Sequence, residues 1–554
     1  MFVRTKRSGQ YSYLQVVHNE RVDGRVRQRV IGTLGRVDEL QASAQLDGLL
    51  NSLGRFADHS AVLSAHRAGE TEVEEALRIG PGLVFERLWR ECGIQRTLER
   101  LLQDRKFEFS VERAVFLTVL HRLFAPGSDR AAEMWRERYR IEGSEELQLQ
   151  HLYRAMAWLG AELPPPQQVG ATPFAPRTTK DEIEEGLFQI RRDLFSSLDL
   201  VFFDTTSIYF EGRGGETLGQ RGHSKDHRPD LPQMVVGAVL DAAGRPLCSE
   251  LWPGNTTDVR TLVPVVDRLR TRFGVHELCV VADRGMISKG TIEALQDGTR
   301  NVRYILGARM RRVKEVRDEV LARGGRYREV RPPRQSSKGP APLQVKEVWV
   351  EDRRYIVCLN EEEARKDRLD REAIVASLEK KLSQGEKALV GNKGYRRFLT
   401  STGNSFRIDR AKLEQEARYD GKFVLQTDLD LDAADVALRY KELWQVEAAF
   451  RSVKSVLDTR PIYHQKDETI RGHVFCSFLA LVLLKELLHR MEEKGGHVEW
   501  ARLREDLDAL EEMKVRTTGR SFILRTPTRG DAGRALQAAG VALGPSVRLL
   551  SSDP

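Results

Sequence analysis

The sequence of 554 residues is too long for one hydrophobic core and suggests three or more structural units. Hydrophobic residues make up 40% of the chain and charged residues 31%, which excludes a disordered or fibrous protein. The formal net charge of +8 favours a polyanionic partner, but 89 basic residues against 81 acidic ones are equally typical of a well-charged globular protein.

The cysteines and the apolar segments indicate where the protein resides. Five cysteines are scattered without the paired spacing of a zinc or disulfide framework: Cys92, Cys248, Cys279, Cys358 and Cys476. Their apolar neighbours predict reduced, buried thiols. The N-terminus, Met-Phe-Val-Arg-Thr-Lys-Arg, lacks the apolar core of a signal peptide. The longest apolar run, Phe475 to Leu484, has about ten residues, whereas a membrane-spanning helix needs roughly 20. We therefore expect a cytoplasmic protein with no membrane partner.

The N-terminal region has the pattern of a β-hairpin. Apolar and polar residues alternate over Tyr11–Val17 and Val26–Leu34, on either side of a turn at Asp23-Gly24. Three arginines share one face of the second strand: Arg25, Arg27 and Arg29. That face either contacts DNA or lies in solvent.

A helical module and a linker follow the hairpin. From Pro81 to Leu163 the spacing of apolar residues predicts helices, interrupted by a polar break at Ala125–Asp129. This arginine-rich module suits either DNA-end binding or packing. The proline-rich stretch from Leu163 to Pro176 predicts a linker, and Lys180–Asp193 predicts a further helix.

The order of elements after the linker is the most informative part of the pattern. Strands are predicted at Leu198–Phe203, with an extended continuation at Ser207–Phe210, and then at Gln233–Leu240, Pro246–Trp252, Leu278–Ala282 and Val302–Leu306. Asn255–Asp258 offers capping side chains for a helix to about Phe273, and a second helix is predicted at Ser288–Gln296. Three strands, helix, strand, helix, strand is the order of the ribonuclease-H-like fold. We therefore predict an α/β protein with a mixed sheet flanked by helices.

Between Gly307 and about Leu431 the sequence departs from that order. Arginines and lysines crowd into residues 309–334, and strands are predicted at Leu343–Val350 and Tyr355–Leu359, after a loop at Pro332–Pro342. We interpret this segment as a β-rich insertion whose basic start is a candidate DNA track.

Two more helices complete the predicted organisation, one from Asp432 to Val456 and a buried one at His473–Leu488. The expected units are an N-terminal hairpin with a helix (1–55), a helical region suited to DNA binding (80–163), the first part of a catalytic domain (190–307), the insertion (308–431), the second part of the catalytic domain (432–490) and a C-terminal region (491–554).

Two aspartates each follow an apolar strand. Asp204 comes after Leu200–Phe203 and Asp283 comes after Cys279–Ala282, on strands that are neighbours in the predicted sheet. Clustered carboxylates without a cation raise one another's pKa, so the pair indicates a cation site. Two Mg²⁺ ions, about 4 Å apart and held by carboxylates, can activate a nucleophile and neutralise phosphate charge in phosphodiester cleavage. The alternative is two ordinary turn or capping aspartates.

A third acid is expected on a helix beside the sheet. Tyr440, Glu447 and Lys454 recur every seven residues, which places them along one helix face, and Arg451 lies on nearly the same stripe. A glutamate with these neighbours can bind metal while the neighbours contact phosphates. The alternative is a solvated helix face with a Glu–Arg pair.

These residues resemble the signature helix of bacterial insertion-sequence transposases of the DDE type. In one large group the helix reads Tyr, two residues, Arg, three residues, Glu, six residues, Lys. Tyr440, Glu447 and Lys454 match this pattern, but Leu443 occupies the Arg position. The phosphate contact of that arginine is therefore in doubt, with Arg439 or Arg451 as candidates to replace it.

Other segments resemble further blocks of the same group, so the resemblance covers most of the chain. The first-aspartate block is similar to Val201–Ser207, and the second-aspartate block to Val281–Met286. The segments His223–Gln233 and Pro253–Asp258 are similar to the blocks between them. The N-terminal hairpin is also similar to the opening of this group.

The resemblance implies a ribonuclease-H-like catalytic domain with a β-rich insertion between the second Asp and the Glu. It implies that Asp204, Asp283 and Glu447 are catalytic metal ligands for Mg²⁺, with Mn²⁺ as a substitute. It also implies cleavage of double-stranded DNA at terminal inverted repeats and strand transfer into target DNA by a synaptic homodimer. Related enzymes are bacterial and cytoplasmic, acting at the nucleoid, and some cut through a DNA hairpin.

Several residues are candidates for DNA contact: Tyr440, Arg451, Lys454, Arg284, and the basic loop residues His223, Lys225, His227 and Arg228. The alternative for the loop is a surface segment stabilised by Asp226 and Asp230. His223 and His227 have no third soft ligand nearby, which argues against zinc. Trp349 and Trp444 could stack on an extruded base, but core packing is the expectation for both.

Three functions remain open at this point. The first is an active transposase, the second a ribonuclease-H-like nuclease that cuts without joining, and the third a non-catalytic DNA-binding repressor derived from a transposase. An intact acid triad speaks against the third, and strand transfer separates the first two. The terminal repeats, the target preference and the segment that reads the ends do not follow from the sequence.

Overall fold

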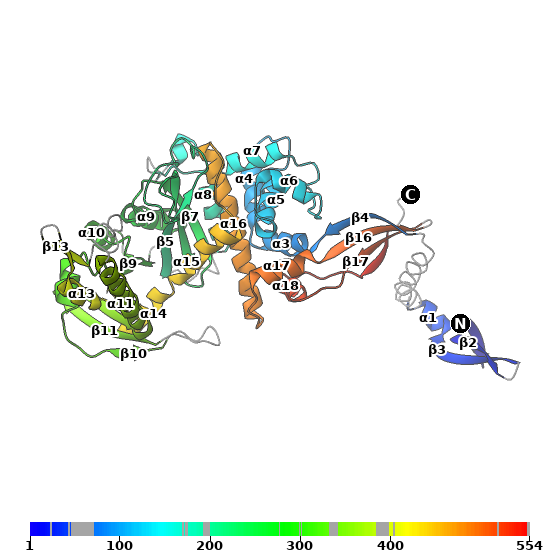
Figure 1. Ribbon diagram of the computed structural model, residues 1–554. Coiled ribbons are helices and arrows are strands. Elements are labelled where there is room, and N and C mark those ends of the chain that lie inside the picture. The colour runs from blue at the N-terminus through cyan, green and yellow to red at the C-terminus, as the bar shows by residue number, and fades with distance from the viewer. Residues whose placement is uncertain are drawn as a thin grey trace. The chain divides into compact units, whose positions relative to one another are not determined.

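The computed structural model describes residues 1–22, 25–42, 45, 71–168, 171, 175–191, 200–275, 277–298, 300, 302–331, 342–383, 398–402, 405–517 and 520–550. The chain divides into two compact units, and Figure 1 shows the elements of both. The first unit consists of Met1–Val84, Glu137–Arg140 and Val498–Pro554. The second consists of Phe85–Arg136 and Ile141–His497.

An antiparallel sheet begins the first unit. Its strands are β1 (Phe2–Ser8), β2 (Tyr11–Val22) and β3 (Arg25–Arg36), and helix α1 (Val37–Ala42) follows. The pairing of β2 with β3 confirms the predicted hairpin, whose turn at Asp23-Gly24 lies outside the described residues. β1, which was not predicted, pairs with the other edge of β2. On β3, Arg29 forms an exposed ion pair with Glu20 over 3.4 Å, so part of this basic face is neutralised.

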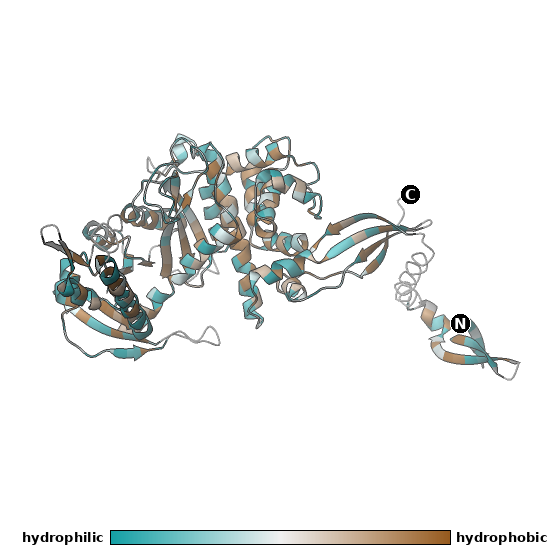
Figure 2. Ribbon diagram, in the orientation of Figure 1, coloured by the Kyte–Doolittle hydropathy of each residue, from teal (hydrophilic) through white to brown (hydrophobic). Residues whose placement is uncertain are grey.

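A second antiparallel sheet belongs to the same unit. Its strands, in spatial order, are β18 (Val547–Leu550), β17 (Arg520–Arg525), β16 (Glu511–Thr517) and β4 (Glu72–Arg78). Helices α17 (Trp500–Asp508) and α18 (Ala532–Ala538) belong to the C-terminal segment. Hydrophilic and hydrophobic residues alternate along β16 (Figure 2), as in strands with one solvated face. β4 was not predicted, because Glu-Val-Glu-Glu-Ala-Leu-Arg has few β-forming residues.

Helices dominate the chain before the main sheet. They are α3 (Gly80–Glu91), α4 (Ile94–Leu102), α5 (Val111–Phe124), α6 (Asp129–Arg136), α7 (Leu149–Leu159) and α8 (Thr179–Ile190). The interruption between α5 and α6 confirms the predicted break at Ala125–Asp129. α5 is buried along nearly its whole length, because α7 and the long helix α16 (Asp467–Glu493) pack on it. None of the described helices, α16 included, combines the length and apolarity that a membrane crossing requires.

A nine-stranded sheet forms the centre of the second unit, in the order β10-β11-β12-β15-β9-β8-β5-β6-β7. The strands that come first in the chain are β5 (Leu200–Tyr209), β6 (Gln233–Asp241), β7 (Pro246–Pro253), β8 (Leu278–Ala282) and β9 (Val302–Gly307). β5, β6 and β7 are antiparallel neighbours, whereas β8 and β9 continue parallel to β5. The predicted mixed α/β sheet is therefore confirmed.

Asp204 lies inside β5, which corrects the predicted end of that strand. The sequence suggested a strand that stops at Asp204 and resumes as an extended segment at Ser207–Phe210. One strand instead runs from Leu200 to Tyr209, because β6 pairs with almost its full length. The parallel partner β8 is shorter, so its pairing with β5 stops at Phe203.

Helices α9 (Leu262–Phe273) and α10 (Lys289–Gln296) pack on this sheet. α9 begins later than predicted, after a 3₁₀ turn at Asp258–Arg260, so Asp258 does not cap it. The core joins strands and helices through buried side chains such as Phe203, Val266 and Val280. Each such side chain contributes about 1.5–3 kcal/mol by its burial. All five cysteines are free and buried, as predicted.

Residues 308–431 contribute four strands that extend the central sheet beyond β9. Their elements are a π-helical turn (Val316–Val320), β10 (Arg328–Val330), β11 (Leu343–Val350), β12 (Arg353–Asn360), α11 (Glu361–Ser383), β13 (Leu399–Thr402), β14 (Ser405–Ile408), α13 (Arg410–Ala417) and β15 (Lys422–Thr427). Two of the strands, β11 and β12, were predicted. The 23-residue α11 was not, because its surface is mostly hydrophilic (Figure 2) and Leu378 is its one buried residue. Most of the predicted loop at Pro332–Pro342 lies outside the described residues.

The single helix predicted from Asp432 to Val456 is wrong, because the segment is broken. It consists of α14 (Ala433–Lys441), α15 (Trp444–Arg451) and a π-helical turn (Ser452–Val456). Between α14 and α15 the backbone changes to tight hydrogen bonds three residues apart, such as Gln445 N–H to the Glu442 carbonyl over 2.9 Å. The buried helix predicted at His473–Leu488 lies within α16.

Candidate active site

The pairing of two strands positions two of the predicted acids. β5 and β8 run parallel with Phe203 opposite Ala282, and Asp204 and Asp283 are the next residues on the two chains. All of β8 is buried, whereas Asp204 and Asp283 are partly exposed. The two carboxylates therefore stand at neighbouring positions where a buried core meets solvent.

All three predicted acids reach one cavity of the second unit. Asp204, Asp283 and Glu447 line an open cavity of about 520 Å³, which we call the carboxylate cavity. Glu447 comes from the exposed side of α15. A larger cavity of about 1020 Å³ shares Asp283, Glu447 and Lys225 with it. The structure thus brings together acids that are far apart in the sequence, despite the break between α14 and α15.

The electrostatics of Asp204 suit a cation. Burial raises the pKa of Asp204 to about 6, and the charges of Asp283 and Asp258 add to the rise, although Lys225 opposes it. The Thr205 N–H also opposes it, because it donates to Asp204 Oδ1 over 2.7 Å. A divalent cation stabilises the ionised form of such a group. The three acids offer only carboxylate oxygens, which fits Mg²⁺ or Mn²⁺ rather than a softer ion.

Tyr440 contacts one of the acids directly. Its hydroxyl donates to Asp283 Oδ1 over 3.2 Å, and its ring stacks on Phe423 with a centroid distance of 5.7 Å. Burial and the charge of Asp283 raise the pKa of Tyr440 far above its ordinary value, so it stays protonated as a donor. At Gly307 a Cβ would lie 2.6 Å from the Tyr440 hydroxyl and 2.9 Å from Arg284 N, so only glycine leaves room for this arrangement.

Lys225 ties β5 to the turn before α9. Its ammonium donates to the Thr205 carbonyl over 2.7 Å and to Thr205 Oγ1 over 2.9 Å. It also forms an ion pair with Asp258 over 3.3 Å, and the Thr205 hydroxyl donates to Asp258 over 2.7 Å. Asp258 lines the larger cavity, so it is a further acid close to the site, although its place in the sequence suggested a capping residue.

The basic loop splits into two groups. His223 and Lys225 line the larger cavity. His227 and Arg228 line neither cavity, and Arg228 forms an ion pair with Asp230 over 2.9 Å. Asp230 therefore stabilises part of the loop, as the alternative interpretation expected, whereas Asp226 pairs with Lys454 and Arg460 outside the loop. His223 and Lys225 face the site.

The remaining basic candidates surround the two cavities. Arg451 and Lys454 line the carboxylate cavity, and Arg284 lines the larger one. Asp226 and Arg460 also line the carboxylate cavity. The sequence suggested Asp226 only as a residue that stabilises the loop, and it suggested no role for Arg460. Nothing in the local sequence marks Arg460, because its partner Asp226 lies more than 200 residues before it.

The basic start of the 308–431 segment is partly neutralised. Arg309, Arg311 and Arg312 line the larger cavity. Arg309 donates to the backbone carbonyls of Arg284 and Gly285 over 2.8 and 2.7 Å. Arg311 pairs with Glu416 over 3.0 Å. Among the described residues, this cluster contributes part of a basic wall rather than a continuous track of free charges.

The expectation of core packing for the two tryptophans is wrong. Trp349 is 50% exposed and Trp444 is 47% exposed. Trp349 Nε1 donates to Glu347 over 2.7 Å on the open face of β11. Alternate positions of β11 face solvent, and Trp444 begins α15 on its exposed side, so apolar character alone did not bury them. Neither side chain lines the two cavities.

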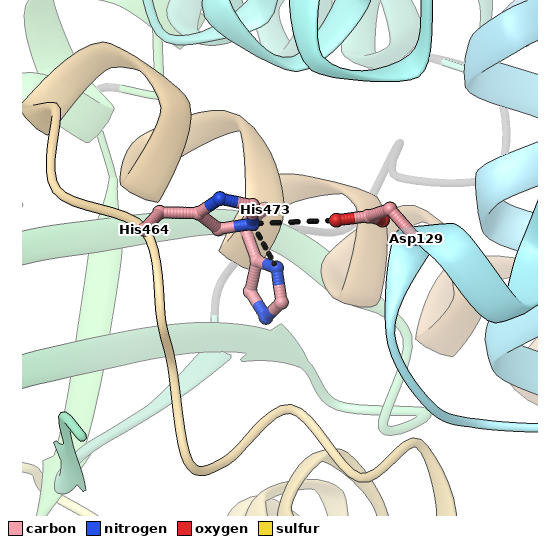
Figure 3. A group of neighbouring side chains, drawn as sticks. All are labelled: Asp129, His464 and His473. Atoms are coloured by element: carbon pink, nitrogen blue, oxygen red, sulfur yellow. Dashed lines mark hydrogen bonds and ion pairs between the residues drawn. The ribbon is translucent and has the colours of Figure 1, made fainter. Parts of the chain in front are cut away.

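A second group of metal-ligand side chains lies outside these cavities. Asp129, His464 and His473 point toward one another (Figure 3), with one ligand atom of each within 4.8 Å of the others. His464 Nε2 lies 3.1 Å from His473 Nδ1 and 3.4 Å from Asp129 Oδ2. The buried Arg122 lies 2.9 Å from His473 Nδ1, the nitrogen that a metal would need. Its guanidinium already places a positive charge there, so the group is a buried hydrogen-bond network.

Comparisons with known proteins identify the family. Residues 2–65 match the IS1634 family transposase, N-terminal domain, and residues 196–483 match the transposase DDE domain, which implies a divalent metal cofactor. No curated protein sequence matches the chain. One similar solved structure is described as "Cryo-EM structure of piggyBac transposase synaptic complex with hairpin DNA (SNHP)". It has 9% sequence identity and a TM-score of 0.35, over 77% of this chain and 79% of that chain. Because the DDE domain covers more than half of its length, the chain belongs to the DDE transposases, enzymes that act on DNA in transposition.

Proposed function

We propose that this transposase cuts DNA at the terminal inverted repeats of its own element and joins the ends to target DNA. Asp204, Asp283 and Glu447 are the proposed ligands of its divalent ions, with Mg²⁺ as the natural ion and Mn²⁺ as a substitute. The observation that carries the proposal is the meeting of these three carboxylates in one cavity. When bound, the ions would activate the attacking oxygen and neutralise charge on the phosphate.

The surrounding side chains support this chemistry. Tyr440 orients Asp283 by its hydrogen bond, so that the carboxylate presents its free oxygen positions to the cavity. Lys225 fixes the strand that carries Asp204 through its contacts to Thr205. Basic side chains around the cavity can hold the DNA backbone on either side of the scissile phosphate: Arg284, Arg451, Lys454 and Arg460.

We also propose a ribonuclease-H-like catalytic domain. The order β7-β6-β5-β8-β9, with the first three strands antiparallel and the rest parallel, supports it. Residues 308–431 are then an insertion whose strands widen the same sheet. The domain boundaries expected from the sequence, at 55, 80, 163, 190, 307, 431 and 490, are part of this proposal.

The partners follow from the chemistry. A transposase must hold two DNA ends together, so we propose a homodimer in the synaptic complex, acting on cytoplasmic DNA at the nucleoid. The resemblance to bacterial insertion-sequence transposases supports both statements. Cleavage through a DNA hairpin is an expectation from the same resemblance.

The test is a cleavage and joining assay with duplexes that carry the inverted repeats of the element, target DNA and Mg²⁺. We compare the wild type with Glu447→Gln and with the control Glu442→Gln, whose side chain lines neither cavity. Joined products from the wild type and the control, but not from Glu447→Gln, are expected. Cutting without joining would indicate a nuclease, and binding of the ends without cutting would indicate a repressor. Equal activity of Glu447→Gln would show that the third ligand is wrong.

A further inference from the structure

Asp226 is a buried acid of the carboxylate cavity that does not belong to the proposed metal-binding set. Its side chain is 5% exposed, and one oxygen, Oδ1, contacts two cations. Lys454 Nζ lies 2.6 Å from it, and Arg460 Nη1 also forms an ion pair with it. The other oxygen, Oδ2, is buried without a hydrogen-bond partner among the described residues.

The three residues come from separate parts of the second unit. Asp226 lies in the loop before β6, Lys454 in the π-helical turn after α15, and Arg460 in the segment before α16. The side chain of Lys454 is 12% exposed and that of Arg460 is 29% exposed, so both cations are held largely away from water. An acid that binds both therefore links the side chains of two elements that border the cavity.

The Arg460 segment is anchored by residues that follow the arginine in the chain. Ile462 exchanges backbone hydrogen bonds with the end of β5, from its N–H to the Tyr209 carbonyl over 3.3 Å and to its carbonyl from Glu211 N–H over 3.0 Å. Further along, His464 joins the buried network with Asp129 and His473 (Figure 3). The backbone is thus held independently of Asp226, and Asp226 determines mainly where the Arg460 guanidinium points.

The charges of Asp226, Lys454 and Arg460 together determine the local charge beside the cavity. One carboxylate against two cations leaves an excess of about one positive charge beside the cavity, which suits a DNA phosphate. Without the carboxylate, the ammonium and the guanidinium would repel each other and be drawn to other acids of the cavity, such as Glu447 and Asp204. They would then compete with the divalent ions for these oxygens.

We propose that Asp226 is a positioning residue, which holds Lys454 and Arg460 as a preformed pair for a backbone phosphate of the DNA strand and keeps both cations off the metal-binding carboxylates. This role rests on the proposed function. Asp226 restrains the two cations but carries no positive charge of its own. Its loss is therefore expected to slow cutting without weakening DNA binding.

The experiment compares Asp226→Asn with Asp230→Asn, a control in the same loop whose carboxylate pairs with Arg228 outside both cavities. Cleavage of duplexes with the element ends is measured in single turnover with Mg²⁺. Binding of the same duplexes is measured without divalent ions at several salt concentrations. Asp226→Asn is expected to cut on the order of 100-fold more slowly, as for a group displaced by about 1 Å. It is expected to bind DNA at least as tightly, with a salt slope steeper by about one phosphate contact.

The control should match the wild type in both assays, and Asp226→Glu, which keeps the charge, should recover part of the cutting rate. Unchanged cutting by Asp226→Asn would overturn the inference, as would a parallel loss of binding and cutting, which indicates a structural role. If the wild type binds the ends but cuts nothing, the proposed function fails. The salt slope of Asp226→Asn still decides whether the acid restrains the two cations.

Discussion

The hydrogen bond from Tyr440 to Asp283 makes a quantitative prediction about metal affinity. Tyr440→Phe removes the hydroxyl that donates to Asp283 Oδ1 over 3.2 Å and leaves the ring stacked on Phe423. A hydrogen bond to a charged group contributes about 1.5–3 kcal/mol, and the length of this one favours the lower end. If this contribution is lost from Mg²⁺ binding, about 1.5 kcal/mol corresponds to a roughly tenfold weaker affinity for Mg²⁺. Loss of a hydrogen-bond partner that orients a metal ligand lowers metal affinity or activity by about 10–100-fold, which agrees with this value.

The assay is a Mg²⁺ titration of single-turnover cleavage. Tyr440→Phe is expected to need about ten times more Mg²⁺ for half-maximal cutting, with unchanged DNA binding and a rate that recovers at high Mg²⁺. Tyr355→Phe is the matched control, since its hydroxyl donates to the carboxylate of Glu315 over 3.0 Å outside both cavities. An unchanged Mg²⁺ requirement in Tyr440→Phe would refute the reasoning, and so would an equal shift in the control.

Three further predictions concern single residues. Gly307→Ala should slow cutting, because its Cβ would lie 2.6 Å from the Tyr440 hydroxyl, and the loss should be smaller when Tyr440→Phe is also present. Lys225→Met should slow cutting without abolishing DNA binding, because it breaks the ion pair of 3.3 Å to Asp258; equal rates would contradict this. Burial, with Arg122, lowers the pKa of His121 to about 4, so the folded state resists protonation that the unfolded state accepts below about pH 6.5. Stability should therefore fall as the pH drops from about 6.5 to 4, by roughly 3 kcal/mol, and urea unfolding of His121→Gln should show a smaller fall.

The parts of the fold with a strong local pattern could be predicted from the sequence. β8 is buried on both faces and therefore appears as an unbroken apolar run, Leu-Cys-Val-Val-Ala, directly before Asp283. The seven-residue spacing of Glu447 and Lys454 also identified residues that reach the carboxylate cavity. Both signals are local, because burial and helix periodicity impose them on neighbouring residues.

Features that depend on distant residues could not be predicted. The boundary of β5 depends on how far β6 and β8 pair with it, so Asp204 appeared to end a strand that continues to Tyr209. The interruption after Lys441 leaves the periodicity of the surrounding helices intact and has no proline or glycine to signal it. The contacts of Asp226 with Lys454 and Arg460 join residues that no local pattern connects.

The central claim is that three carboxylates of one cavity hold divalent ions. Its most direct measurement is a titration of the full-length protein with Mn²⁺, in which free Mn²⁺ is monitored by electron paramagnetic resonance. The wild type is expected to bind Mn²⁺, and Asp283→Asn and Glu447→Gln to lose most of that binding. The control Asp318→Asn, whose exposed carboxylate pairs with Arg317, should bind as the wild type does. Equal Mn²⁺ binding by the wild type and Asp283→Asn would contradict the account.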